Sequence, residues 1–320
     1  MKNSVLITGG AGFIGFSLSK KLLEQKYKVY SIDNFNDYYS VKIKKDRIKY
    51  LKKEYDNFFF KKIDLINFKK LNEFVKKKNI KKIIHLAAQA GVRYSYQRPD
   101  IYFQSNLLGF FNVIEMARKN NIKEILAAST SSVYGDQNKF PIKENFDTSK
   151  PIQFYAATKK SNEVMGYSYY KMFKMNFVFM RFFTVYGPWG RPDMSLYKFT
   201  KNILKNKKID VYNNGKHVRD FTYIDDIVYG IHKLILKKNY GYKIFNIGNT
   251  KKVKLMDMIK ILEKNLNKKA KINFLPMQPG DIYQTQSSTK NLKNYVNYKS
   301  KTKIETGIKN FLDWYLSYHK

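Results

Sequence analysis

The chain has 320 residues, and its 61 Lys and Arg against 25 Asp and Glu give a formal net charge of 61 − 25 = +36. A hydrophobic fraction of 43% excludes a disordered polycation, because segments that stay unfolded lack apolar surface to bury. The absence of cysteine excludes disulfides, cysteine-bound zinc and a thiol nucleophile. No stretch reaches the roughly 18–20 uncharged apolar residues of a membrane span. Only Met1–Ser4 precede the first apolar run, so no secretory segment fits there and a cytoplasmic location is expected.

The positive charge raises the possibility of nucleic-acid binding, but its distribution argues against it. Seven of the basic residues are Arg, which leaves 61 − 7 = 54 Lys, and these are spread in twos and threes. Nucleic-acid readers rely on Arg forks that Lys cannot replace. We interpret the lysines as a solvated coat and expect no nucleic-acid partner. We expect Arg to remain where a fork is needed, as at Arg93, Arg191 and Arg219.

Apolar runs typical of strands alternate with stretches of helical spacing along the first part of the chain. The expected strands are Val5–Thr8, Lys28–Asp33, Phe58–Asp64, Lys82–Ala88, Glu124–Thr130, Phe177–Phe183 and Ile244–Asn249; the helical stretches include Ile14–Glu24, Leu71–Lys77 and Asn106–Arg118. This alternation predicts an α/β fold with a doubly wound parallel (Rossmann) sheet. Beyond Phe183 the alternation breaks, which predicts a second, smaller α/β substrate domain.

The first strand runs directly into the glycine-rich loop Gly9-Gly10-Ala11-Gly12-Phe13-Ile14-Gly15, which opens a helix. Glycines at 9, 12 and 15 allow a tight turn, close approach to a pyrophosphate and packing of helix on strand. The helix N-terminus favours the anionic phosphates. This context predicts a dinucleotide site that includes Gly9, Gly12, Phe13, Ile14 and Gly15.

The ends of the next strands supply further candidate cofactor ligands. Asp33, 18 residues after Gly15, can accept both ribose hydroxyls of NAD and would repel the 2′-phosphate of NADP. Asn34 follows it. Asp64 ends the third expected strand and is placed near the adenine, and Ala87 and Ala88 end the fourth beside the middle of the cofactor.

Tyr155 and Lys159 lie four residues apart and therefore on one face of a helix. A free phenol has a pKa near ~10, too high for a general base at neutral pH. A nearby ammonium and the positive ring of NAD⁺ are expected to lower that pKa. Thr130 ends the fifth expected strand, at the edge of the sheet that faces the ligand crevice. We therefore expect Tyr155 and Lys159 to be catalytic, close to the strand end that carries Thr130.

These motifs, in this order, resemble the extended short-chain dehydrogenase/reductases over nearly the whole chain. The similarity is carried by Gly9–Gly15, His85–Ala88, Ser131–Gly135, Tyr155–Lys159 and Arg181–Pro188. Longer strings are similar to the NAD-dependent nucleotide-sugar epimerases that act on UDP-glucuronate: Asp33–Tyr39, Ala88–Arg93, Trp189–Met194, Arg219–Asp226 and Pro276–Asp281. The resemblance implies epimerisation at C4 through a transient 4-keto sugar with tightly held NAD, in polysaccharide biosynthesis.

The resemblance also implies roles for single residues. Tyr155 would take the O4 proton, Thr130 would hydrogen-bond the sugar 4-hydroxyl, and Lys159 would bridge Tyr155 and the nicotinamide ribose. The remaining roles concern substrate binding: Ser131, Ser132 and Thr184 for the sugar carboxylate, Arg191 and Arg219 for the diphosphate, and Asp281 for the uridine ribose. Two roles remain open for Arg93: it forms the carboxylate side of the sugar pocket, or it only braces the loop after the fourth strand.

Related enzymes with other activities remain as alternatives. The 4,6-dehydratases carry Asp-Glu after the catalytic threonine, and the UDP-glucuronate decarboxylases carry a Glu at the second position, whereas this chain has Ser131-Ser132. A UDP-galactose or UDP-N-acetylhexosamine 4-epimerase is the first alternative, and a decarboxylase is less favoured. A non-catalytic NAD-fold protein that binds RNA through its lysines is the alternative from a different class.

The resemblance further implies a domain division and a homodimer. Residues 1–183, with roughly 220–250 returning to them, would bind NAD, and residues 184–320 would bind the UDP-sugar. Relatives pair through two helices that correspond here to about 106–118 and 156–171. Four scattered histidines and no carboxylate cluster predict no metal site. Asp225 and Asp226 are expected to cap the helix that follows them.

Overall fold

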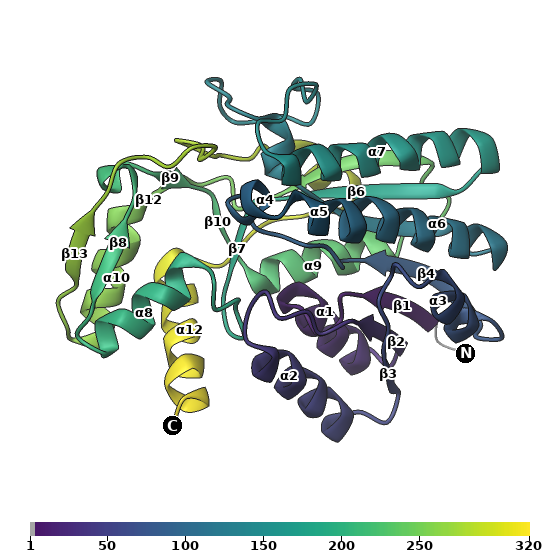
Figure 1. Ribbon diagram of the computed structural model, residues 1–320, viewed down its shortest axis with the longest axis horizontal. Helices are drawn as coiled ribbons and strands as arrows, with labels where there is room; N and C mark the ends of the chain where they lie inside the picture. The colour runs from purple at the N-terminus through teal and green to yellow at the C-terminus, as the bar shows by residue number, and fades with distance from the viewer. Residues whose placement is uncertain (1–3) are drawn as a thin grey trace.

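The computed structural model describes residues 4–320, and its main element is a seven-stranded sheet in which every neighbouring pair is parallel (Figure 1). The strands, in their order across the sheet, are β11 (Tyr242–Ile247), β6 (Asn176–Phe182), β5 (Glu124–Thr130), β4 (Ile80–His85), β1 (Ser4–Thr8), β2 (Lys28–Asp33) and β3 (Phe58–Lys62). The order reverses between β1 and β4, which places the ligand crevice at the carboxyl ends of these strands. The predicted doubly wound fold is confirmed.

Helices cover both faces of this sheet, because each strand sends alternate side chains to opposite sides. On β1, Val5 and Ile7 belong to one hydrophobic core and Leu6 to the other. The first core is covered by α1 (Phe13–Glu24), α2 (Val41–Glu54) and α9 (Ile224–Ile235), and the second by α3 (Phe68–Val75), α6 (Gly109–Lys119) and α7 (Phe154–Phe173). Two short helices, α4 (Tyr94–Gln97) and α5 (Pro99–Tyr102), and a π-helical turn at Phe103–Leu108 lead into α6.

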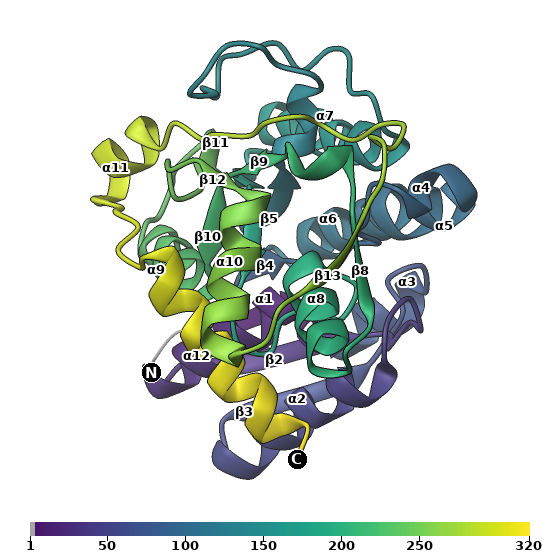
Figure 2. The same ribbon diagram turned by 90° about the vertical axis from the view of Figure 1, so that its left-hand side faces the viewer.

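The smaller part of the chain lies beside the carboxyl ends of the main sheet and faces the viewer in Figure 2. Its elements are α8 (Ser195–Leu204), β8 (Lys208–Val211), α10 (Leu255–Leu266), β13 (Lys271–Phe274) and α12 (Ile304–Tyr318). Helix α11 (Lys290–Val296) packs instead against β11 of the main sheet. β8 pairs with β13, and two further pairs connect this part to the main sheet: β7 (Thr184–Tyr186) with β10 (Phe221–Tyr223), and β9 (Val218–Arg219) with β12 (Val253–Lys254).

Several local expectations were wrong. β3 ends at Lys62 and not at Asp64, and β11 spans Tyr242–Ile247 and not Ile244–Asn249. β4 ends at His85 and not at Ala88, because the chain leaves the strand there to pass the glycine-rich loop. A Cβ on Gly9 would lie 2.6 Å from the Ala87 nitrogen, so the two segments are in contact. Asp226 does not cap α9; its carboxylate accepts from the backbone N–H groups of Lys301 (3.0 Å) and Thr302 (3.1 Å). Among the described helices, none has both the length and the apolarity needed to cross a bilayer.

Candidate active site

A cavity of about 760 Å³ opens at the carboxyl ends of the central strands and extends to the smaller part of the chain. Every residue that we assigned to the cofactor, the chemistry or the substrate lines it. They are Gly9, Gly12, Phe13, Ile14, Gly15, Asp33, Asn34, Asp64, Ala87, Ala88, Arg93, Thr130, Ser131, Ser132, Tyr155, Lys159, Thr184, Arg191, Arg219 and Asp281. These residues come from opposite ends of the chain, so the fold brings them together.

The glycine-rich loop forms one end of the cavity. Gly9 has a positive φ of 71°, and Gly12 precedes α1, whose N-terminus faces the cavity. A Cβ on Gly15 would collide with the backbone carbonyl of Gly9, so only glycine fits there. The free N–H groups at the start of α1 suit a phosphate group.

The Asp33 carboxylate has two backbone donors, one in this loop and one just after Asp33 in the chain. It accepts from the N–H of Ala11 at 3.2 Å and from the N–H of Phe35 at 2.8 Å. Burial raises the pKa of Asp33, and both hydrogen bonds oppose that rise. Asn34 donates to the Asp64 carboxylate at 3.0 Å, which joins the ends of β2 and β3. The glycine-rich loop and the α1 N-terminus fit the phosphates of a dinucleotide, and the Asp33 carboxylate fits its ribose.

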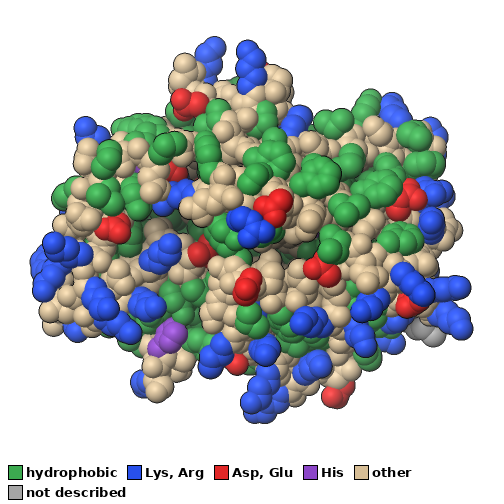
Figure 3. Space-filling view, in the orientation of Figure 1, with side chains coloured by type: hydrophobic (Ala, Val, Ile, Leu, Met, Phe, Trp, Pro, Cys, Tyr) green, Lys and Arg blue, Asp and Glu red, His purple; other side chains and the backbone are tan. Residues whose placement is uncertain are grey.

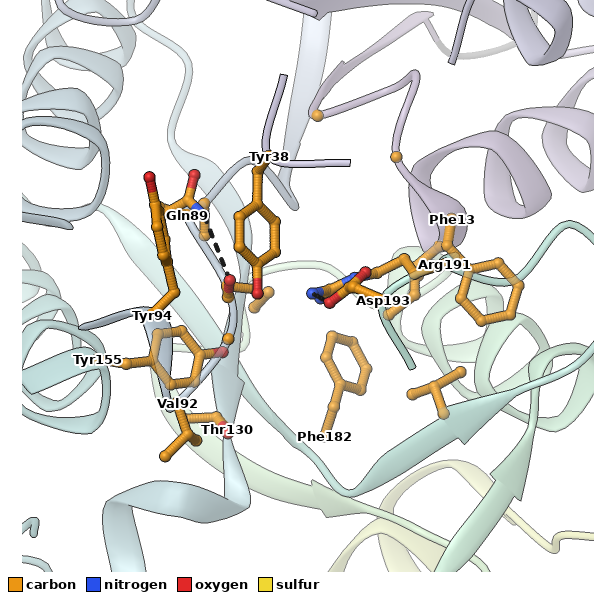
Figure 4. A pocket seen from close by; sticks show the side chains of 18 of the residues that line it. Phe13, Tyr38, Gln89, Val92, Tyr94, Thr130, Tyr155, Phe182, Arg191 and Asp193 are labelled. Atoms are coloured by element: carbon orange, nitrogen blue, oxygen red, sulfur yellow. Dashed lines mark hydrogen bonds and ion pairs between the residues drawn. The ribbon is translucent and has the colours of Figure 1, made fainter. Parts of the chain in front are cut away.

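Tyr155 and Thr130 share one wall of the cavity, as Figure 4 shows. Burial raises the pKa of the Tyr155 phenol, whereas the Thr130 hydroxyl and the Arg191 guanidinium lower it. The sequence assigned this lowering to Lys159 and the bound cofactor, and that role stays a prediction. Lys159 is buried and its ammonium lacks a hydrogen-bond partner within the described chain. Burial lowers the pKa of Lys159 to about 8, and Glu163 one turn further along α7 opposes this. An unpartnered ammonium in the cavity fits a ribose hydroxyl.

Small hydroxyl side chains continue this wall. Thr130 donates to the Ser132 hydroxyl at 3.2 Å and accepts from the Ser132 N–H at 3.1 Å. Ser131 lies between them in the chain and also lines the cavity. Thr184 begins β7, where its N–H donates to the Asp220 carbonyl at 3.1 Å. The four side chains offer hydroxyl donors and carry no charge.

Arg191 occupies the middle of the cavity together with Asp193 (Figure 4). Its Nε and Nη2 donate to the two Asp193 carboxylate oxygens, at 3.0 and 2.5 Å. Burial would lower the pKa of Arg191, but Asp193 raises it overall, so that the guanidinium stays charged. The Nη1 edge carries no Asp193 contact and can meet an anion. Sequence reasoning missed Asp193, although its position two residues after Arg191 was a usable signal.

Arg219 and Arg93 lie toward the smaller part of the chain. Arg219 donates to the Tyr283 carbonyl at 2.9 Å, and burial lowers its pKa to about 10. Arg93 forms an ion pair with Asp281 at 2.8 Å and lies over the Tyr212 ring, with its guanidinium carbon 4.5 Å from the ring centroid. The pair connects the loop after β4 to the segment around Asp281, a contact that the sequence did not predict for either residue.

Buried polar side chains behind the wall fix α6 and α7 relative to the sheet. Asn106, in the π-helical turn, donates to the Gln89 carbonyl at 3.1 Å and to the Thr158 hydroxyl at 3.0 Å. Glu163 accepts from Ser129 at 2.7 Å and from two nitrogens of Arg181 at 2.9 and 2.7 Å. Sequence reasoning missed these contacts, because no local spacing marks them. Within residues 4–320 there is no cluster of side chains that could hold a metal ion.

Comparison with known proteins places the chain in a family. The NAD dependent epimerase/dehydratase family matches residues 5–248, and the chain belongs to it. Protein CapI of Staphylococcus aureus is 44% identical over 99% of both chains. The UDP-glucuronate 4-epimerase of Thermodesulfobacterium geofontis is 39% identical over 97% of this chain and 95% of that protein. The structure of the Bacillus cereus UDP-glucuronic acid 4-epimerase with UDP-glucuronic acid and NAD is similar, with a TM-score of 0.93, 32% identity and coverage of 98% and 99% of the two chains.

Proposed function

We propose that this protein is an NAD-dependent UDP-glucuronate 4-epimerase, which interconverts UDP-glucuronate and UDP-galacturonate. The observation that carries the substrate assignment is that four uncharged hydroxyl side chains, called here the hydroxyl wall, line the same cavity as Tyr155: Thr130, Ser131, Ser132 and Thr184. A sugar carboxylate can accept hydrogen bonds from such a wall, whereas an acidic side chain there would repel it. Relatives and solved structures named for this activity, similar over nearly the full chain, support the assignment.

The cofactor site would be made by the glycine-rich loop, Asp33, Asn34, Asp64, Ala87, Ala88 and Lys159. NAD, when bound, supplies a hydride acceptor and donor for C4 of the sugar. Tyr155 would remove the proton from O4 and later return it, while Thr130 hydrogen-bonds the same oxygen. Lys159, placed one turn after Tyr155, would hold the ribose and stabilise the phenolate.

Substrate binding would come from both parts of the chain. Arg191 presents its free Nη1 edge, and Arg219 lies further along the cavity, so the two can hold the diphosphate. Asp281 would bind the uridine ribose. Its ion pair with Arg93 supports a bracing role for Arg93 next to the nucleotide, over direct contact with the sugar carboxylate. The 4-keto form of glucuronate is a β-keto acid, which is prone to lose CO₂. Ser131, Ser132 and Thr184 would hold its carboxylate away from the geometry that permits this loss.

The same proposal assigns NAD and the UDP-sugar to different parts of the chain. Residues 1–183 would bind NAD together with roughly 220–250, which supply α9 and β11 to the main sheet, and residues 184–320 would otherwise bind the UDP-sugar. A cytoplasmic location is part of the same proposal.

A homodimer through α6 and α7 is the proposed assembly. Figure 3 shows hydrophobic side chains gathered over these helices. Phe111 is 43% exposed, Val164 56%, Tyr167 47% and Met172 67%. Size-exclusion chromatography with light scattering should give a dimer mass, and Val164→Glu should give a monomer. Leu236→Glu, a control at an exposed apolar residue after α9, should leave the mass unchanged; monomeric wild type would refute the dimer.

Incubation of the purified protein with UDP-glucuronate tests the activity. Formation of UDP-galacturonate supports the proposal. Turnover of UDP-galactose together with no reaction of UDP-glucuronate would refute it. Release of CO₂ with UDP-xylose would instead identify a decarboxylase. Binding of RNA by a protein that turns over none of these sugars would identify a non-catalytic member of the fold.

A further inference from the structure

Arg47, on α2, is a buried cation that the proposed chemistry does not use. Its side chain is 0% exposed. Its Nη1 donates to the Ala11 carbonyl at 2.8 Å and to the Tyr39 hydroxyl at 3.1 Å. Its Nη2 donates to the Trp189 carbonyl at 2.5 Å and more weakly to the Gly190 carbonyl at 3.5 Å. A buried guanidinium is costly unless it is hydrogen-bonded, so these carbonyls determine where it sits.

The carbonyls belong to two different functional loops. Ala11 lies in the glycine-rich loop, and its own N–H donates to Asp33, the expected ribose ligand. Trp189 and Gly190 lie in the segment 187–194, called here the Arg191 loop, which carries Arg191 into the cavity. One guanidinium therefore bonds both the cofactor loop and the loop that presents the diphosphate ligand.

The Arg191 loop contains an unfavourable backbone conformation at the point where Arg47 contacts it. Trp189 has a φ of 62°, in the left-handed region that bulky residues rarely adopt. Its indole is held among aromatic rings, with centroid distances of 5.1 Å to Phe16, 5.4 Å to Trp314 and 5.2 Å to Tyr318. A strained residue keeps such a conformation only where its surroundings enforce it. The bond from Arg47 to the Trp189 carbonyl is one of the contacts that do so.

We infer that Arg47 is a positioning residue that couples the cofactor site to the diphosphate site by holding the Arg191 loop against the glycine-rich loop. The inference rests on the proposed function, because that function gives Arg191 its ligand. Without Arg47 the Arg191 loop is free to relax, and the Nη1 edge of Arg191 shifts from its place in the cavity. Because one guanidinium bonds both loops, its loss is expected to weaken UDP binding and NAD retention together.

Two substitutions test this coupling with UDP and NAD as probes. Arg47→Met removes all the bonds, and Arg47→Lys keeps the charge but lacks the fork that reaches both loops. The dissociation constant of UDP is measured by calorimetry with saturating NAD, and the loss of NAD is followed during dialysis. Both variants should bind UDP about tenfold more weakly, equivalent to about 1.4 kcal/mol, and should lose NAD faster than wild type.

Tyr298→Phe is the matched control, since it also removes a buried hydrogen bond, from its hydroxyl to the Gly248 carbonyl at 3.1 Å, away from the cavity. It should lower the melting temperature without changing UDP affinity or NAD retention. If the Arg47 variants behave like this control, or change only one of the two readouts, the coupling is refuted. Should Arg47→Met fail to fold, Arg47→Lys decides alone. The two readouts are binding measurements and do not require turnover. The coupling can therefore be tested even if the epimerase assay fails.

Discussion

Replacing Ser132 with glutamate would put a negative charge into the hydroxyl wall. The Ser132 Oγ lies 3.2 Å from Thr130 Oγ1, so a carboxylate at this position projects toward the space where the sugar would lie. Two like charges ~4–5 Å apart repel by about 3–4 kcal/mol at an effective dielectric constant of ~20. Because the site is open to salt and water, about 1.5–3 kcal/mol should remain. This corresponds to a loss of about 10- to 100-fold in affinity for UDP-glucuronate.

The assay compares inhibition or binding constants for UDP-glucuronate and UDP-glucose in Ser132→Glu, Ser132→Gln and wild type. UDP-glucose has the same nucleotide and ring but no carboxylate, so its binding should change much less. Ser132→Gln matches the added volume without the charge, and should impair both ligands about equally. An equal loss for both ligands in Ser132→Glu would refute the reasoning that the wall recognises the carboxylate.

The remaining predictions concern helix α7, which carries Tyr155, Lys159 and Glu163. Tyr155→Phe should reduce turnover at least ~1,000-fold while UDP and NAD still bind, as measured by calorimetry; retained turnover would remove Tyr155 as the base. Lys159→Met should abolish activity yet stabilise the fold by about 2 kcal/mol at pH 7, because burial lowers the pKa of Lys159 to about 8, below its unfolded value of 10.5. Between these two pH values Lys159 of the wild type binds more protons in the unfolded chain than in the folded one, so the stability of the wild type rises with pH. The difference in free energy of unfolding between Lys159→Met and wild type, measured in denaturant, should therefore shrink as pH rises from 8 toward 10.5. A constant difference would contradict this. Glu163→Gln should cost about 3–5 kcal/mol in the same assay, because Arg181 would be left buried without its carboxylate.

The central strands, and the residues at their ends that line the cavity, were predictable from the sequence, because each depends on a local pattern. Continuous apolar runs marked β1, β2 and β5, and glycine spacing marked the loop after β1. Helix α2 escaped detection, since its lysines obscure the apolar stripe of Ile43, Ile48 and Leu51 that it buries.

The supporting contacts of the site could not be predicted, because they join residues far apart in the chain. Glu163 meets Arg181 from 18 positions away, and Arg47 meets Trp189 from 142 positions away. Asp226 was assigned to the nearest helix end because local spacing favours a cap, whereas tertiary structure brings it to Thr302. Residue types at motif positions therefore indicate which side chains line the cavity, and only the folded chain shows which contacts hold them in place.

The most direct test of the central claim is a proton NMR time course of purified protein with UDP-glucuronate and no added reductant or oxidant. The account predicts that UDP-galacturonate appears until a stable ratio of the two sugars is reached, with no net change in NADH absorbance. An unchanged UDP-glucuronate spectrum from protein that holds NAD and turns over UDP-galactose would contradict it.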